Sequence, residues 1–114
     1  MKRRNKSKAI RVHPGSRNVY SDLGYANADD MLVKAQLVAK IAELIRLKDL
    51  TQERAARILG LTQPKVSALL RGQFRGVSER KLLNCLTSLG RDVQIVIKQA
   101  PRRRAEGKLT VLFG

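Results

Sequence analysis

The sequence predicts a mainly α-helical protein, with five helices, one or two short β-strands at the C-terminus and a flexible basic arm at the N-terminus. Three observations predict this architecture. Hydrophobic residues form 43% of the 114 residues but aromatic residues only 4%, so the core must be aliphatic. Apolar residues recur at helical spacing between residues 28 and 89. After residue 92 they alternate instead, at the spacing of a strand.

The charge of the chain is strongly positive and unevenly placed. The 24 Lys and Arg residues outnumber the 9 Asp and Glu residues, which gives a formal net charge of +15. Residues 1–17 are rich in Lys and Arg, contain no acid and end in a Pro-Gly-Ser turn, so we expect a flexible arm that either contacts a partner or remains solvated. Such a charge attracts polyanions, and nucleic acid is the first partner to consider.

The first long helix is expected to begin near Ala28, because Asn27 can cap it and two acids follow in its first turn. Its apolar positions continue to about Lys48 or Asp49. Apolar residues before this helix are expected to pack on the core: Val19, Tyr20, Leu23 and Tyr25. Residues 18–91 are therefore interpreted as one folded domain.

The last helix and the two strands are predicted from the spacing of apolar residues, which changes after residue 90. Ser78 can cap a helix whose apolar face includes Cys85, and Gly90 can end it. Beyond it, residues 92–98 and 109–113 alternate like strands, and the first of them contains three candidate dimer contacts: Val93, Ile95 and Ile97. The two strands could pair with each other or with another chain, and a core helix face is the alternative dimer contact. Residues 92–114 are thus expected to form a β extension that contacts a dimer mate or a partner.

Two short helices joined by a tight turn occupy the stretch TQERAARILGLTQPKVSALLRG. Thr51 can cap a helix over 52–59, and Thr62 can cap a second over 63–71. A glycine suits the end of the first helix, where the backbone commonly adopts positive φ. Small and apolar residues hold the two helices together: Ala56, Gly60, Leu61, Val66 and Leu69. This spacing predicts a helix-turn-helix motif over 51–71.

The polar residues of this motif indicate DNA binding. Residues near the start of a recognition helix contact base edges in the major groove, while the preceding helix lies across the backbone. The candidates for base contacts are Gln63, Lys65, Ser67 and Arg71. The candidates for phosphate contacts are Thr51, Gln52, Thr62 and Arg75. The alternative is that these side chains only coat a solvated helix.

The same stretch resembles the Cro/cI-type, or XRE, family of helix-turn-helix repressors, with Gln52, Ala56, Gly60, Leu61, Gln63, Val66, Ser67 and Leu69 on the family pattern. The flanking segments NVYSDLGYANADDMLVKAQLVAKI and RGQFRGVSERKLLNCLTSLGRDVQIVIK look like HigA-type antitoxins within that family. The resemblance implies a Cro/cI-like fold and a bacterial type II toxin–antitoxin system. It implies a homodimer that represses its own operon on double-stranded DNA and neutralises a small basic ribonuclease of RelE/HigB type. No contact residue for a toxin is carried over.

Other classes of function fit the sequence less well. No nucleophile–base pair, metal cluster or phosphate-binding loop is visible, so we expect no catalytic residue, no metal and no cofactor, and not an enzyme. The alternatives that stay open are a stand-alone repressor without a toxin, and a protein-interaction module whose helix-turn-helix does not bind DNA. A basic start without an apolar run argues against a signal peptide, so we expect a cytoplasmic protein without a membrane span.

Overall fold

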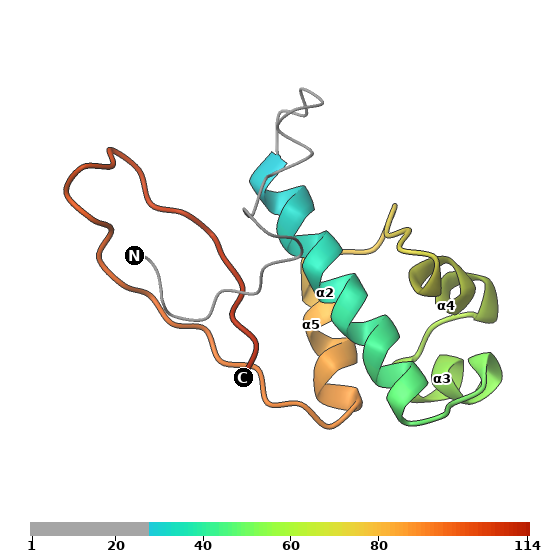
Figure 1. Ribbon diagram of the computed structural model, residues 1–114. Helices are drawn as coiled ribbons and strands as arrows, with labels where there is room; N and C mark the ends of the chain where they lie inside the picture. The colour runs from blue at the N-terminus through green and yellow to red at the C-terminus, as the bar shows by residue number, and fades with distance from the viewer. Residues whose placement is uncertain (1–27) are drawn as a thin grey trace. The chain divides into compact units, whose positions relative to one another are not determined.

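The computed structural model describes residues 28–114, and these contain four α-helices (Figure 1). The helices are α2 (Ala28–Leu47), α3 (Gln52–Leu59), α4 (Gln63–Leu70) and α5 (Glu79–Ser88). Their bounds agree with the four ranges predicted from apolar spacing, but the described part of the chain has one helix fewer than the expected five. The basic arm, the apolar cap around Tyr20 and the Asn27 cap lie outside the described residues.

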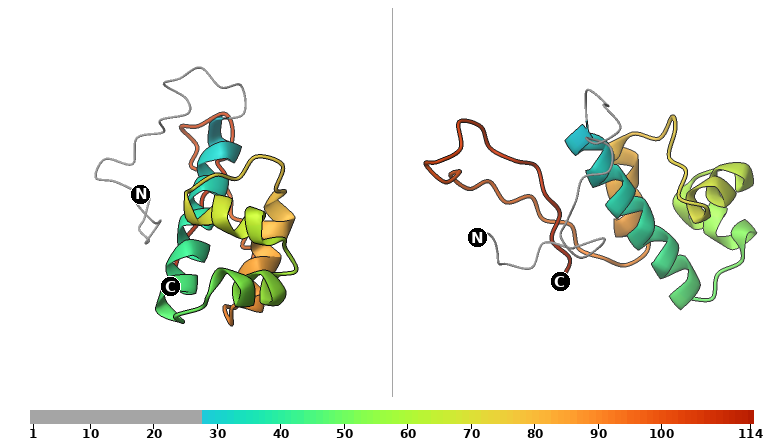
Figure 2. Two further views of the ribbon diagram at one scale, coloured as in Figure 1. Left: turned by 90° about the vertical axis from the view of Figure 1, so that its right-hand side faces the viewer. Right: turned by 45° about the horizontal axis from the view of Figure 1, so that its top comes forward.

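The chain divides into two compact units, of which Leu37–Gln94 contains the second half of α2 together with α3, α4 and α5. Within it α3 packs against both α4 and α5, and Figure 2 shows these short helices in two further views. The largest side chains that are fully buried in this unit are almost all aliphatic: Ile41, Leu44, Ile45, Leu69, Leu82, Val38, Val66 and Cys85. The prediction of an aliphatic core, with Cys85 in it, is confirmed.

Three of the helices begin at hydroxyl caps, as the sequence predicts. The side-chain oxygens of Thr51, Thr62 and Ser78 accept hydrogen bonds from the amides three residues later, over 3.1, 3.3 and 3.0 Å. Each bond satisfies an amide that has no partner inside its own helix. These caps fix where α3, α4 and α5 start, and therefore which residues form their first turns.

All four helices end in a reversal at a residue with positive φ, and the next amide bonds back to a carbonyl five residues earlier. The reversal residues are Asp49, Gly60, Gly72 and Gly90, with φ of 55°, 68°, 80° and 91°. The returning amides belong to Leu50, Leu61, Gln73 and Arg91, with N···O distances of 2.9 to 3.1 Å. This is the Schellman arrangement, in which glycine is favoured because it lacks a Cβ. Asp49 occupies the equivalent position after α2, although its Cβ makes positive φ less favourable.

The second unit includes, among the described residues, 28–36 and Ile95–Gly114. The prediction of two strands near the C-terminus is wrong for these residues: no strand forms over 92–98 or 109–113, and only Leu112 has an isolated β-bridge. The alternating side chains are not buried, since Ile95 is 79% exposed and Ile97 is 93% exposed. Alternation stabilises a strand only when one face is covered, so here the pattern alone does not produce a strand.

Candidate nucleic-acid interface

Helix α4 is built with one face in the core and its start in solvent. Val66 and Leu69 are fully buried, whereas Gln63 and Lys65 are exposed in its first turn. Pro64 also lies in that turn, where its missing N–H has no helical partner to lose. The two apolar anchors thus determine which polar side chains remain available to a ligand.

The turn between α3 and α4 has the conformation that the sequence predicts. Gly60 adopts φ of 68°, and the Leu61 amide donates to the carbonyl oxygen of Ala56 at 3.0 Å. Ala55, Ala56 and Leu59 are buried on the inner side of α3. The small alanines allow α4 to pack closely against α3, which sets the angle at which α4 leaves the core.

The candidate base-contacting residues are of two kinds. Gln63 and Lys65 lie at the start of α4, and Lys65 reaches over the following loop, because a Cβ on Gly76 would lie 3.4 Å from its Nζ. Ser67 and Arg71 lie one turn apart farther along, and the Arg71 Nη1 donates to the Ser67 Oγ at 2.6 Å. Ser67 is half-buried and Arg71 is exposed, so the arginine is the member of the pair that a ligand can reach.

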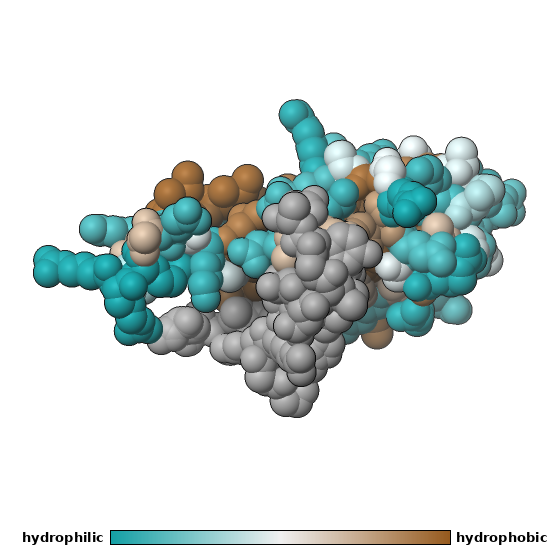
Figure 3. All heavy atoms as spheres, turned by 90° about the horizontal axis from the view of Figure 1, so that it is seen from above, coloured by the Kyte–Doolittle hydropathy of each residue, from teal (hydrophilic) through white to brown (hydrophobic). Residues whose placement is uncertain are grey.

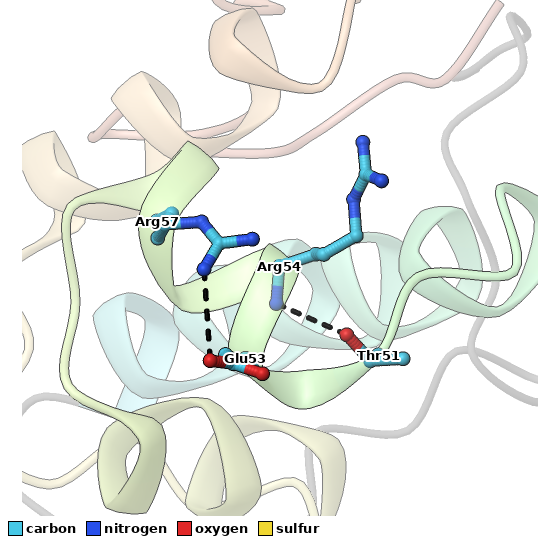
Figure 4. Close-up of polar contacts among 4 residues, drawn as sticks. All are labelled: Thr51, Glu53, Arg54 and Arg57. Atoms are coloured by element: carbon cyan, nitrogen blue, oxygen red, sulfur yellow. Dashed lines mark hydrogen bonds and ion pairs between the residues drawn. The ribbon is translucent and has the colours of Figure 1, made fainter.

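The candidate phosphate-contacting residues Thr51, Gln52, Thr62 and Arg75 are all exposed. Each of the two threonine oxygens accepts one capping bond, and each hydroxyl hydrogen can still be donated to a phosphate. Figure 4 shows the start of α3, where Glu53 pairs with Arg57 over 3.6 Å and the Arg54 side chain extends away from Thr51. Glu53 places negative charge at this helix start, and the pair with Arg57 compensates it.

The third residue of each short helix is basic. Arg54, Lys65 and Lys81 stand where a capping box would place Glu or Gln. A positive side chain at the positive end of the helix dipole costs stability unless an anion is near. At α4 no acid lies in the first turn to offset it, so the exposed start of this helix is the one best suited to an anionic partner.

Several residues that shape this surface were not among the sequence candidates. Gln73 accepts from the Arg71 Nη2 at 3.4 Å, and Arg46 of α2 donates from its Nη2 to the carbonyl oxygen of Leu70 at 3.5 Å. Lys81 of α5 donates to the carbonyl oxygen of Leu59 at 2.9 Å. Arg54 could have been found as a basic residue near a cap. The partners of Arg46 and Lys81 are 24 and 22 residues away, and no local pattern marks them.

The described residues include one cysteine, Cys85, which is free and buried. Burial raises the pKa of the Cys85 thiol above its ordinary value of 9.0, and the nearby charge of Lys81 offsets this rise only in part. In residues 28–114, no three His, Cys, Asp or Glu side chains come together as metal ligands would. None of the four described helices is both long enough and apolar enough to span a membrane.

The C-terminal extension presents apolar side chains to solvent. Ile95, Val96 and Ile97 form an exposed run, and Leu109 and Leu112 are about half exposed on the return segment. Figure 3 shows apolar side chains gathered on one face of this extension. The structure thus leaves Ile95 and Ile97 exposed to a possible partner, while Val93 is partly buried.

Comparisons with known proteins agree with this geometry. A helix-turn-helix domain family matches residues 19–98. A solved structure described as an XRE family transcriptional regulator is 36% identical and superimposes with a TM-score of 0.72, covering 77% of this chain and 99% of that one. No match is found among curated proteins. The matched family is one of transcription regulators rather than enzymes.

Proposed function

This chain belongs to the XRE helix-turn-helix family and is a DNA-binding transcriptional regulator, and we propose that it reads a specific operator with α4 and represses its own operon. The observation that carries the proposal is the exposed first turn of α4. There Gln63 and Lys65 project from a helix end that has no acid in its first turn, while Val66 and Leu69 anchor the opposite face.

Each side chain has a chemical role in this proposal. Gln63 can bind adenine through its amide, and Lys65 and Arg71 can bind guanine; each such contact discriminates between bases by about 1–3 kcal/mol. Ser67 supports Arg71 through the 2.6 Å hydrogen bond. Thr51, Gln52, Thr62 and Arg75 take the phosphates on either side of the groove, and these contacts set position without reading sequence.

We propose that the active form is a homodimer. One α4 reads only a few base pairs, whereas a two-fold dimer places two reading helices about 34 Å apart on one face of DNA. The exposed side chains of Ile95 and Ile97, with Val93, supply the contact in this proposal. Covering them in a dimer removes apolar surface from water, which supports association.

We further propose that the protein is the antitoxin of a type II pair and neutralises a RelE/HigB-like ribonuclease. The HigA-like segments on both sides of the motif support this assignment. A chain of charge +15 repels a basic ribonuclease, so the contact must be made by apolar side chains or around local acids rather than by net charge. A stand-alone repressor is the alternative, and the neighbouring gene decides between them.

Fluorescence anisotropy tests the DNA-binding proposal. The purified protein is titrated into the duplex from just upstream of its own gene and into a shuffled duplex, at about 150 mM salt, where sequence-independent binding is weak. We expect a preference for the native duplex of about a thousandfold or more. Equal and weak binding to both duplexes contradicts autorepression and points to a protein as the first partner.

Co-expression tests the antitoxin proposal separately. The small gene beside the coding sequence is expressed alone and together with this protein, and growth and messenger RNA integrity are followed. We expect growth arrest with RNA cleavage when the neighbour is alone, and recovery when both are present. Normal growth with the neighbour alone leaves a stand-alone repressor, without affecting the anisotropy result.

A further inference from the structure

The guanidinium of Arg71 is held by two neutral acceptors before any ligand arrives. Its Nη1 donates to the Ser67 Oγ at 2.6 Å, and its Nη2 donates to the Gln73 Oε1 at 3.4 Å. A guanidinium has five N–H donors, so three remain for a ligand. Arg71 is therefore exposed and partly oriented at the same time.

The backbone explains how Gln73 comes to lie beside Arg71. Gly72 reverses the chain with φ of 80°, and the Gln73 amide donates to the carbonyl oxygen of Ala68 at 2.9 Å. The reversal that ends α4 thus returns Gln73 to the end of the helix. The contact depends on the turn as well as on the side chain.

The two acceptors of Arg71 are neutral, whereas Arg57 on α3 pairs with a carboxylate of the same helix. Arg57 faces the carboxylate of Glu53, 3.6 Å away, which partly offsets its positive charge. Ser67 and Gln73 orient Arg71 while leaving its charge intact, and an intact charge is what attracts an anionic ligand.

We infer that Gln73 is a positioning residue for operator recognition, because it orients the Arg71 guanidinium for its contact with a base. The inference rests on the proposed function, which assigns Arg71 to that contact. Ordering a long side chain on binding lowers affinity, and an arginine held in place beforehand avoids part of this loss. Bidentate contact with guanine also requires a defined orientation of the guanidinium plane.

The test uses Gln73→Met, which keeps the length of the side chain and removes the acceptor. An operator duplex is first selected from a random-sequence library with the full-length protein, so that the test does not depend on where the natural operator lies. Anisotropy then compares wild type, Gln73→Met, Arg71→Ala and the double variant on the selected duplex and on a shuffled one. Gln99→Met, at an exposed glutamine outside α4, its following turn and the proposed dimer contact, is the matched control.

We expect Gln73→Met to weaken binding to the selected duplex about three- to tenfold and to leave binding to the shuffled duplex unchanged. In the Arg71→Ala background it should have no further effect, because the group that Gln73 positions is gone. The salt slope should stay the same, since no phosphate contact is lost. In the free protein, nitrogen relaxation should show a more mobile Arg71 Nε–H in Gln73→Met, and no change in Gln99→Met.

The outcomes separate this inference from the proposed function. If Arg71→Ala weakens binding to the selected duplex but Gln73→Met does not, the positioning role is overturned and the reading helix stands. If Arg71→Ala leaves the base preference unchanged, the assignment of Arg71 in the proposed function is wrong. An equal loss from Gln73→Met with and without Arg71 also overturns the inference, because the glutamine then acts by itself.

Discussion

Lys81 of α5 donates a hydrogen bond from its Nζ to the carbonyl oxygen of Leu59, the last residue of α3, over 2.9 Å. Carbonyls in the last turn of a helix have no partner within it, and they lie at the negative end of the helix dipole. The ammonium therefore satisfies one such carbonyl and ties α5 to the turn that sets the direction of α4.

Lys81→Met should lower the free energy of unfolding by about 1–2 kcal/mol, because a partly buried carbonyl loses a charged donor. Urea denaturation measures the change. Arg80→Met removes the same charge at the neighbouring exposed position and should cost much less. Equal losses in the two variants would mean that charge, and not the bond to Leu59, is responsible.

Gly60→Ala should destabilise the fold by about 1–2 kcal/mol, because φ of 68° is unfavourable for a residue with a Cβ. The added Cβ would lie 3.4 Å from the Lys81 Nζ, an ordinary contact, so the cost comes from the backbone conformation. Thermal unfolding provides the measurement. Gly107→Ala is the control, since no atom lies within 4 Å of a Cβ there. If the Gly60 variant were as stable as the control, positive φ at residue 60 would not be the reason that glycine is needed there.

Asp49→Asn should raise the free energy of unfolding by about 0.5 kcal/mol. Asp49 has φ of 55° just after α2, and an acid there is repelled by the end of the helix dipole. Asparagine tolerates this conformation and has no charge. Asp49→Ala loses the same charge but does not tolerate the conformation, so it should gain less. If both variants gained equally, the conformational part of the argument would fail.

Stability should fall above pH 9.0 in part because of Cys85. Its folded pKa is raised by burial, so as the pH passes the ordinary value the thiol ionises in the unfolded chain but stays protonated in the folded one. The contribution is complete below pH 9.0 and is lost as the pH rises through the folded pKa. The difference in stability between wild type and Cys85→Ala should therefore shrink with rising pH in urea titrations; a constant difference would contradict it.

Gln63→Ala combined with Lys65→Ala should abolish the preference for the native duplex and leave weak, salt-sensitive binding, because phosphate contacts remain. Anisotropy on native and shuffled duplexes measures both effects. The control pair Gln99→Ala and Lys108→Ala removes the same residue types from exposed positions outside residues 92–98. Unchanged preference in the Gln63 and Lys65 variant would exclude the first turn of α4 from base recognition.

Local chemistry explains why the helices could be predicted so closely. A hydroxyl cap, an apolar period and a terminal glycine act within a few residues, as at Ser78, Cys85 and Gly90, and the structure confirms each of them. The strand prediction failed for the opposite reason. Alternation around Ile95 is also local, but a strand requires hydrogen bonds from a second segment, and the sequence does not say whether one is present.

The candidate site, too, was predictable from the sequence only in part. That Gln63, Lys65 and Arg71 are exposed follows from the positions of Val66 and Leu69 on the helix, and the structure bears out that exposure, while their roles in reading bases remain predictions. The reach of Lys65 toward Gly76 does not follow from spacing, because it depends on how the loop after α4 returns.

By itself, the sequence determined the aliphatic core, the limits of the four helices and the residues that α4 exposes, because periodicity and capping depend on neighbours along the chain. Only the tertiary structure decided that Lys81 bonds to Leu59, that Arg46 bonds to Leu70, and that Gln73 turns back to Arg71. The first two join residues from helices that meet only when the core packs, and the third depends on the reversal at Gly72. Such contacts depend on three-dimensional proximity, and a linear pattern does not encode that directly.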